Sequence, residues 1–210
     1  MLPSPYNSFR IAALASLLMV GALAPSYGQT AQARIDISST ASDPIDLIIE
    51  EVGNDGRADF VAGNRRTIVA HFPATTTWQE GSITVSSEKA GRIVLLPTGP
   101  WVQLNAETKL MNPVFIEYDN FQVTRTLLEN GSFEEVGTLD QPKNWYKSDV
   151  PKSNPPLTPE TSARVITKDA PDGKNYIRVW HNSRLGQTVV IDAKAPVKIT
   201  FSYRLATTVP

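Results

Sequence analysis

Apolar residues alternate with polar residues along most of the chain, at the two-residue period of a β-strand. Ile35 and Ile37 alternate with polar neighbours, and the same pattern returns at 81–86, while Gly-Asn-Asp-Gly at 53–56 is a turn signal. No stretch has the longer period of an amphipathic helix. Strands are expected at residues 35–38, 45–49, 67–72, 81–86, 92–96, 101–104, 114–123, 175–181, 185–190 and 197–204. The pattern predicts an all-β fold, an antiparallel β-sandwich or barrel.

The first 28 residues have a different pattern. Arg10 precedes an Ala- and Leu-rich apolar run at 11–24, and small residues follow up to Gly28. This is the order of a secretory signal peptide. The apolar run is shorter than the roughly 20 residues that a membrane span needs, although an N-terminal anchor is the alternative. We expect residues 1–28 to be removed and the protein to be secreted, either extracellular or periplasmic, with no membrane span.

Charge and cysteine content narrow the functional classes. The chain has 20 Lys and Arg against 21 Asp and Glu, and loss of Arg10 with the signal peptide leaves a mature net charge of −2. Without a basic excess to neutralise phosphates, nucleic acid is not an expected partner. The chain has no cysteine, which excludes disulfides, thiol catalysis and Cys-ligated zinc. A secreted domain of this kind must be held by its core, with or without a metal.

A distinctive motif lies at residues 127–135. Two leucines end a strand, Asn130-Gly131-Ser132 makes a turn, Phe133 returns to the core, and Trp145 follows after a Pro-bearing loop. This order resembles the opening of CenC-type carbohydrate-binding modules, galactose-binding-like jelly rolls attached to secreted glycoside hydrolases. The resemblance implies that Trp145 is a packing residue, and the same is expected of Trp78.

The rest of the chain resembles the same family with its halves in swapped order. Residues 34–125 are similar to the C-terminal half of such a module, most clearly at 78–85 and 114–123. Residues 127–210 are similar to the N-terminal half. Two interpretations stay open. The halves close on each other as one circularly permuted jelly-roll domain, which we favour because half a sandwich leaves an apolar face bare. Alternatively, the chain is a fragment cut from tandem modules.

The strand expected at 175–181 has an informative alternation. Ile177 and Val179 point to one side and should be core, so Tyr176, Arg178 and Trp180 share the opposite side. Aromatic rings can stack on the apolar faces of sugars while a guanidinium bonds the hydroxyls. By the same alternation Trp101 and Gln103 share a face and are candidates for the same site. The alternative is that these rings cover a second apolar layer.

The resemblance also implies a structural Ca²⁺ ion. Modules of the family hold it with carboxylates near the opening turn and the closing strand, where this chain has Glu134 and Asp119. Carboxylate oxygens are the hard ligands that Ca²⁺ prefers. Only these two carboxylates are placed in this way, and the sequence has no EF-hand-type loop.

Catalysis has little support in the sequence. His71 and His181 lie on different expected strands, and no metalloprotease, nucleophile-elbow or phosphate-loop motif is present. We therefore expect a secreted, non-catalytic protein that binds a polysaccharide through an aromatic-lined sheet face, with a secreted glycoside hydrolase as a candidate partner. The alternatives are a structural or adhesion sandwich that binds protein, and a truncated piece of a modular glycoside hydrolase.

Overall fold

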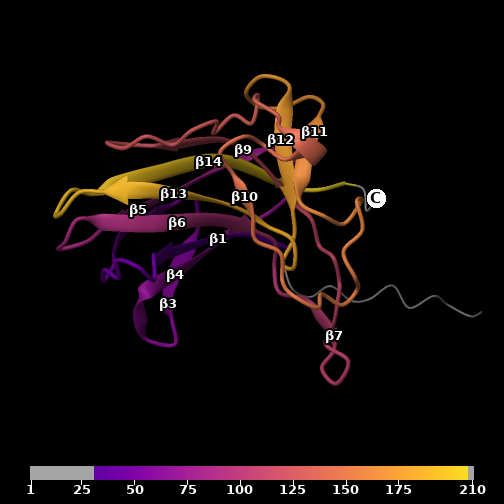
Figure 1. Cartoon of the computed structure of the whole chain (residues 1–210), viewed down its shortest axis with the longest axis horizontal. Helices are drawn as coiled ribbons and strands as arrows, with labels where there is room; N and C mark the ends of the chain where they lie inside the picture. The colour runs from indigo at the N-terminus through magenta and orange to yellow at the C-terminus, as the bar shows by residue number, and fades with distance from the viewer. Residues whose placement is uncertain (1–30, 208–210) are drawn as a thin grey trace, which may run out of the picture.

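The computed structural model describes residues 31–207 of the chain. The signal peptide expected at 1–28 lies outside the described residues. Figure 1 shows two layers of β-strands with long connections gathered at one end. The strands form two six-stranded antiparallel sheets, so the prediction of an all-β sandwich is confirmed. Among the described residues, no helix is long and apolar enough to cross a membrane.

The first sheet takes its strands from both ends of the described chain. In spatial order they are β10 (Tyr146–Lys147), β13 (Leu185–Ile191), β6 (Gly91–Thr98), β1 (Gln32–Ser39), β4 (Asn64–Pro73) and β3 (Arg57–Val61).

The second sheet is mixed in the same way. Its strands, in spatial order, are β11 (Arg164–Thr167), β12 (Asn175–Val179), β9 (Ile116–Val123), β14 (Val197–Leu205), β5 (Gln79–Ser86) and β2 (Ile48–Gly53). The remaining elements are a projecting hairpin and one short 3-10 turn: β7 (Gln103–Asn105), β8 (Leu110–Met111) and η1 (Thr138–Asp140).

Strand alternation builds the interior. In β1, Ala33, Ile35 and Ile37 are fully buried, whereas Arg34 and Asp36 between them face outward. Side chains of both sheets meet in one apolar layer, because successive residues of a strand point to opposite faces.

Aromatic contacts join the two layers. Phe72 of the first sheet packs edge-on against Phe201 of the second, with ring centroids 5.1 Å apart. Tyr118, on β9, donates a hydrogen bond to the carbonyl of Thr98 on β6, across the sandwich, at 2.8 Å. Its hydroxyl also accepts one from the Arg34 backbone N–H at 2.8 Å.

Segments 34–125 and 127–207 share this interior. Strand β13 of the later segment pairs with β6 of the earlier one, and β14 lies between β9 and β5. The buried apolar residues of both segments form one continuous cluster. The swapped family order of the two segments stays a prediction.

The motif around Asn130 closes one edge of the core. Asn130 has a φ of 51°, and a Cβ on Gly131 would lie 2.0 Å from the carbonyl oxygen of Phe121, so only glycine fits there. The buried rings of Phe133 and Trp145 follow, with centroids 5.1 Å apart. The packing role expected of Trp145 is confirmed, whereas Trp78 is only partly buried.

Candidate functional site

The residues predicted on β12 lie on the sides that the alternation assigns to them. Ile177 and Val179 are in the core, and Tyr176, Arg178 and Trp180 point away from it. However, both aromatic rings on that outer side are covered. Tyr176 is 1 % exposed and Trp180 is 0 % exposed. Neither ring offers a face on which a sugar could stack.

Trp180 belongs to a second apolar cluster outside the main core. Met111 and Phe115 are buried with it, and the Phe115 ring centroid lies 6.1 Å from that of Trp180. The indole Nε1 donates a hydrogen bond to the carbonyl of Thr161 at 2.6 Å. The second apolar layer that was the alternative interpretation is the environment observed for Trp180.

Tyr176 is covered by two side chains, one from β14 and one from the residue before β5. The ring of Trp78 packs edge-on against it with centroids 5.5 Å apart, and the Arg204 guanidinium lies 5.3 Å from its ring centroid. Arg178 donates from Nε to Oε1 of Glu117 at 3.0 Å. Protein contacts thus cover both predicted rings of β12, whereas 12 % of the Arg178 side chain stays exposed.

Trp101 and Gln103 are exposed, as a binding role requires. Trp101 is 55 % exposed and precedes the projecting hairpin, and Gln103 begins strand β7. The Gln103 side chain donates to the carbonyl of Asn105 at 3.3 Å. Trp101 packs edge-on against His181, with ring centroids 4.5 Å apart. The structure therefore places Trp101 beside the loop after β12, separate from the buried Tyr176.

Asp119 and Glu134 bind the same turn. Oε1 of Glu134 accepts hydrogen bonds from the backbone N–H groups of Lys174 and Asn175, both at 2.8 Å. Oδ2 of Asp119 accepts one from Asp172 N–H at 2.9 Å. Burial raises the pKa of Asp119 to about 6, and the charges of Asp172 and Glu134 act in the same direction. The two predicted carboxylates do lie near each other.

Whether this pair holds a cation is a separate question. Oδ1 of Asp119 is buried and has no hydrogen-bond partner among the described residues. Within the same part of the chain, no three His, Cys, Asp or Glu side chains are grouped to hold a metal ion. Three backbone N–H groups already bind these carboxylates. The Ca²⁺ site stays a prediction.

The outer face of the first sheet carries a charged cluster that sequence reasoning did not identify. Arg34 donates to Asp36 from Nε at 2.6 Å and from Nη2 at 3.0 Å. In the strand register His71 stands opposite both Arg34 and Arg57. Burial, followed by the charges of Arg34 and Arg57, lowers the pKa of His71. Charged groups of three neighbouring strands therefore converge around the imidazole.

The cluster continues toward Trp101. Burial lowers the pKa of His181 to about 4, and the positive charges of Arg34 and Arg184 act in the same direction. Nδ1 of His181 has no hydrogen-bond partner among the described residues. Arg184 donates from Nε to the carbonyl of Ser148 at 3.1 Å, and a guanidinium carries further N–H donors at its tip.

A second exposed aromatic lies across the sheet. Tyr146, on β10, is 42 % exposed. A Cβ on Gly186 would lie 2.9 Å from Cζ of Tyr146 and 3.0 Å from Cδ1 of Leu96, so the phenol ring lies directly over the glycine. In register, Leu96 stands opposite Asp36. Tyr146 therefore flanks the same outer face as the Arg34–Asp36 pair. We call this surface the first-sheet face; it comprises Arg34, Asp36, His71, Trp101, Tyr146 and Arg184.

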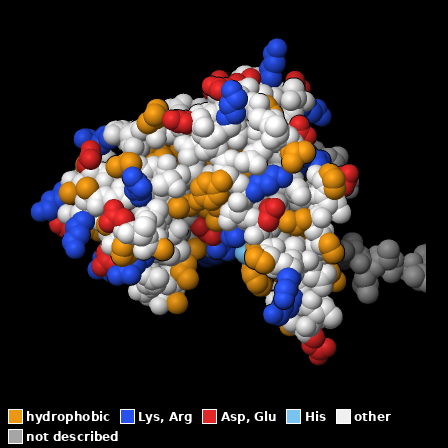
Figure 2. Space-filling model, viewed as in Figure 1, with side chains coloured by type: hydrophobic (Ala, Val, Ile, Leu, Met, Phe, Trp, Pro, Cys, Tyr) orange, Lys and Arg blue, Asp and Glu red, His pale blue; other side chains and the backbone are white. Residues whose placement is uncertain are grey.

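Figure 2 shows this side of the molecule with a hollow between the strands β3 and β4 and the projecting β7–β8 hairpin. Basic, acidic and histidine side chains line the hollow, and an apolar patch lies beside it. Protein-family models, curated proteins and solved structures gave no match to this chain. The resemblance of residues 127–145 to a carbohydrate-binding family stays a prediction.

The first-sheet face has the parts of a site for a polar, non-ionic ligand. It offers exposed aromatic rings, guanidinium donors and carboxylate acceptors, from the strands of the first sheet and the segments next to them. The sequence contains a pattern that could have identified this face. The alternation of β1 puts Arg34 and Asp36 on the side of the strand opposite to Ile35 and Ile37. Tyr146 follows the core residue Trp145 directly, and so faces the other way.

Proposed function

We propose that this protein is a non-catalytic carbohydrate-binding protein that captures a polysaccharide on the first-sheet face. The observation that carries the proposal is the presence of two exposed rings, Tyr146 on β10 and Trp101 in the segment before β7, beside the hydrogen-bonded Arg34–Asp36 pair of the first sheet. Rings of this kind stack on the apolar faces of sugars, and the paired polar groups bond the hydroxyls. Strands β1 and β10 hold Arg34, Asp36 and Tyr146 in place before the ligand arrives, which lowers the entropic cost of binding.

The charge balance of the face favours a neutral sugar chain. Arg34, Arg57 and Arg184 lie near Asp36, Asp59 and Asp149, so that positive and negative side chains occur in equal number. Sugar hydroxyls both donate and accept hydrogen bonds, and a mixture of guanidinium and carboxylate groups serves both. A strongly anionic ligand would meet the three carboxylates as well as the three arginines.

The proposal also includes secretion and an associated enzyme. The signal-peptide pattern at residues 1–28 supports a place outside the cytoplasm. Attachment to a polysaccharide would raise the local concentration of a tethered or associated glycoside hydrolase. The adhesion alternative, a sandwich that binds protein, predicts that Trp101 and Tyr146 contact a protein instead.

Calcium binding at Asp119 and Glu134 is part of the proposal. The buried, unpartnered Oδ1 of Asp119 is an oxygen that a cation could coordinate. The measurement is the thermal unfolding temperature in calcium against that in a chelator. A saturable rise in calcium that Asp119→Asn abolishes supports the site, and identical unfolding in both buffers contradicts it.

The carbohydrate proposal is tested with a glycan array and with pull-downs on insoluble polysaccharides. The wild-type protein is compared with the double variant Trp101→Ala/Tyr146→Ala and with the control Leu139→Ala, which removes another exposed apolar side chain. We expect the double variant to lose retention at least tenfold, on the order of two stacking contacts of about 1 kcal/mol each. The control should bind as wild type. Equal retention by all three proteins would overturn the assignment.

A further inference from the structure

A row of charged side chains crosses the outer side of the second sheet. In the strand register Arg164 stands opposite Arg178, Arg178 opposite Glu117, and Glu117 opposite Arg204. The row thus runs over β11, β12, β9 and β14 in that order. We call these residues the arginine row. None of them belongs to the first-sheet face.

Both carboxylate oxygens of Glu117 accept hydrogen bonds from arginines. It is 2 % exposed, and its Oε1 accepts from Arg178 Nε at 3.0 Å and Nη2 at 2.6 Å. Its Oε2 accepts from Arg204 Nε at 2.6 Å. One negative charge is therefore shared between two positive ones, and the buried part of the row keeps a net positive charge.

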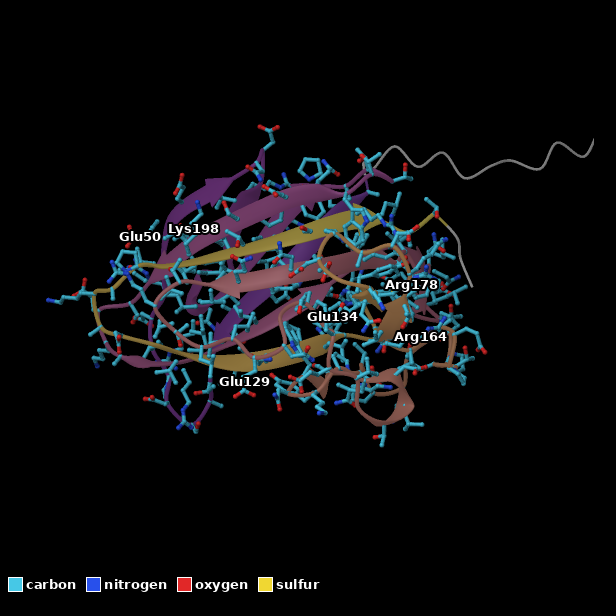
Figure 3. All side chains as sticks on the ribbon, turned by 90° about the horizontal axis from the view of Figure 1, so that it is seen from above. Glu50, Glu129, Glu134, Arg164, Arg178 and Lys198 are labelled. Atoms are coloured by element: carbon cyan, nitrogen blue, oxygen red, sulfur yellow. The ribbon has the colours of Figure 1, made fainter. Side chains whose placement is uncertain are left out.

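Arg164 adds another positive charge beside the pair. It faces Arg178 directly across neighbouring strands, an arrangement in which like charges repel. Figure 3 shows both labelled side chains at the same end of the sheet. Arg164 donates from Nη1 to the backbone carbonyl of Pro159, and in the described part of the chain it has no carboxylate within ion-pair distance. Glu160, on the preceding loop, is exposed, and a hydrogen bond from Thr158, with a smaller effect of the Arg164 charge, lowers the pKa of its carboxyl, so this acid offsets Arg164 only through solvent.

The row is partly open to solvent and bordered by aromatic rings. Arg164, Arg178 and Arg204 each keep a fraction of their side chain exposed. The Arg204 guanidinium lies 4.3 Å from the ring centroid of Trp78, which limits the approach of water on that side. Charge interactions are stronger in such a half-buried setting than in bulk water.

We propose that the arginine row binds an oxyanion, a carboxylate or a sulfate group carried by an acidic sugar or another anionic ligand. Guanidinium groups match such groups with paired N–H donors. An oxyanion between Arg164 and Arg178 accepts from N–H groups that Glu117 and Pro159 leave free, and it relieves the repulsion between the two side chains. The ligand class differs from the neutral chain proposed for the first-sheet face, and so does the sheet.

Sodium sulfate is the first probe, and the readout is the NMR signal of the arginine Nε–H groups at constant ionic strength, with sodium chloride as the reference salt. In the wild-type protein we expect saturable shifts for Arg164 and Arg178, which flank the proposed site, with sulfate only. Arg164→Gln should weaken sulfate binding about tenfold, the loss typical of one charge-assisted hydrogen bond. Arg92→Gln, at an exposed arginine on the other sheet, is the matched control and should bind sulfate as wild type. Non-saturable shifts, or equal binding by Arg164→Gln, would overturn the proposal.

Sugar probes separate the two sources of the oxyanion. Glucuronate carries a carboxylate, glucose 6-sulfate carries a sulfate ester, and glucose carries neither. Competition with inorganic sulfate by glucuronate assigns the carboxylate, and competition by glucose 6-sulfate assigns the sulfate ester. Equal competition by glucose contradicts an oxyanion site. Trp101→Ala/Tyr146→Ala should leave these shifts unchanged, so failure here and failure of the first-sheet proposal are distinguishable.

Discussion

The indole ring of Trp101 packs edge-on against the imidazole of His181, with ring centroids 4.5 Å apart. Trp101 is about half exposed, whereas His181 is almost fully buried. Trp101 therefore shields a titratable group while it presents its own ring to solvent. Because of this contact, a change at Trp101 on the first-sheet face should alter the protonation of His181, which can be measured.

Replacing Trp101 with alanine should raise the pKa of His181 from about 4 toward 6.5. Burial is the main cause of the lowered pKa, and the substitution removes part of that cover. The folded pKa lies below the unfolded one, so His181 lowers stability as the pH falls from 6.5 to 4, and the variant should show a smaller loss. NMR titration of the imidazole signals measures the pKa directly. Leu139→Ala should leave it at the wild-type value, and an unchanged pKa in Trp101→Ala would contradict the shielding role.

Asp119 should affect stability in the opposite direction. Its folded pKa of about 6 lies above the ordinary aspartate value of 3.8. The fold is therefore most favoured when the carboxyl is protonated, and stability is lost as the pH rises from about 4 through 6. Asp119→Asn removes this titration and keeps an oxygen to accept from Asp172 N–H. We expect the variant to match wild type near pH 4 and to exceed it by up to about 3 kcal/mol above pH 7.

Urea unfolding at a series of pH values measures this difference. Asp169→Asn, on the same turn at an exposed position, controls for the loss of one negative charge. If the difference between Asp119→Asn and wild type does not change with pH, Asp119 is not the source of the dependence. The experiment is run in chelator, so that a bound cation does not compete with the proton.

The variants Trp180→Ala and Trp101→Ala should differ strongly in their free energy of unfolding. Trp180→Ala removes a fully buried ring that packs with Met111 and Phe115 and donates to Thr161, so it should cost about 3–5 kcal/mol of unfolding free energy. Trp101→Ala should cost about 1 kcal/mol or less, because the ring is largely exposed. Denaturant unfolding measures both. A stable Trp180→Ala variant would contradict the packing role.

The sequence predicts the sandwich well where alternation is strong, and poorly where strands are short edges. Ile35 and Ile37 alternate with polar residues, and their strand appears as expected. Strand β3 at one edge and β11 at the edge of the other sheet were not predicted. In β3 the charged Arg57 and Asp59 dilute the apolar signal, as is common on edge strands.

The same limit explains the predicted binding face. Alternation along β12 correctly separates Ile177 from Tyr176, because the two-residue period is a local property. What covers the outer side is not local. Trp78, the residue before β5, packs against Tyr176, and Phe115, the residue before β9, packs against Trp180. A strand's own pattern cannot show whether distant segments leave its outer face open.

Gly186 should control the position of the Tyr146 ring. A Cβ at residue 186 would lie 2.9 Å from Cζ of Tyr146, closer than carbon atoms approach, so Gly186→Ala must move the ring off the strand. If Tyr146 stacks on the ligand, Gly186→Ala should weaken polysaccharide retention about as much as Tyr146→Ala, by roughly three- to tenfold. Affinity electrophoresis in soluble polysaccharide measures the change. Tyr146→Phe keeps the ring over the glycine and should retain most of the binding. Wild-type retention by Gly186→Ala, with the ring displaced in its NMR spectrum, would show that Tyr146 does not contact the sugar.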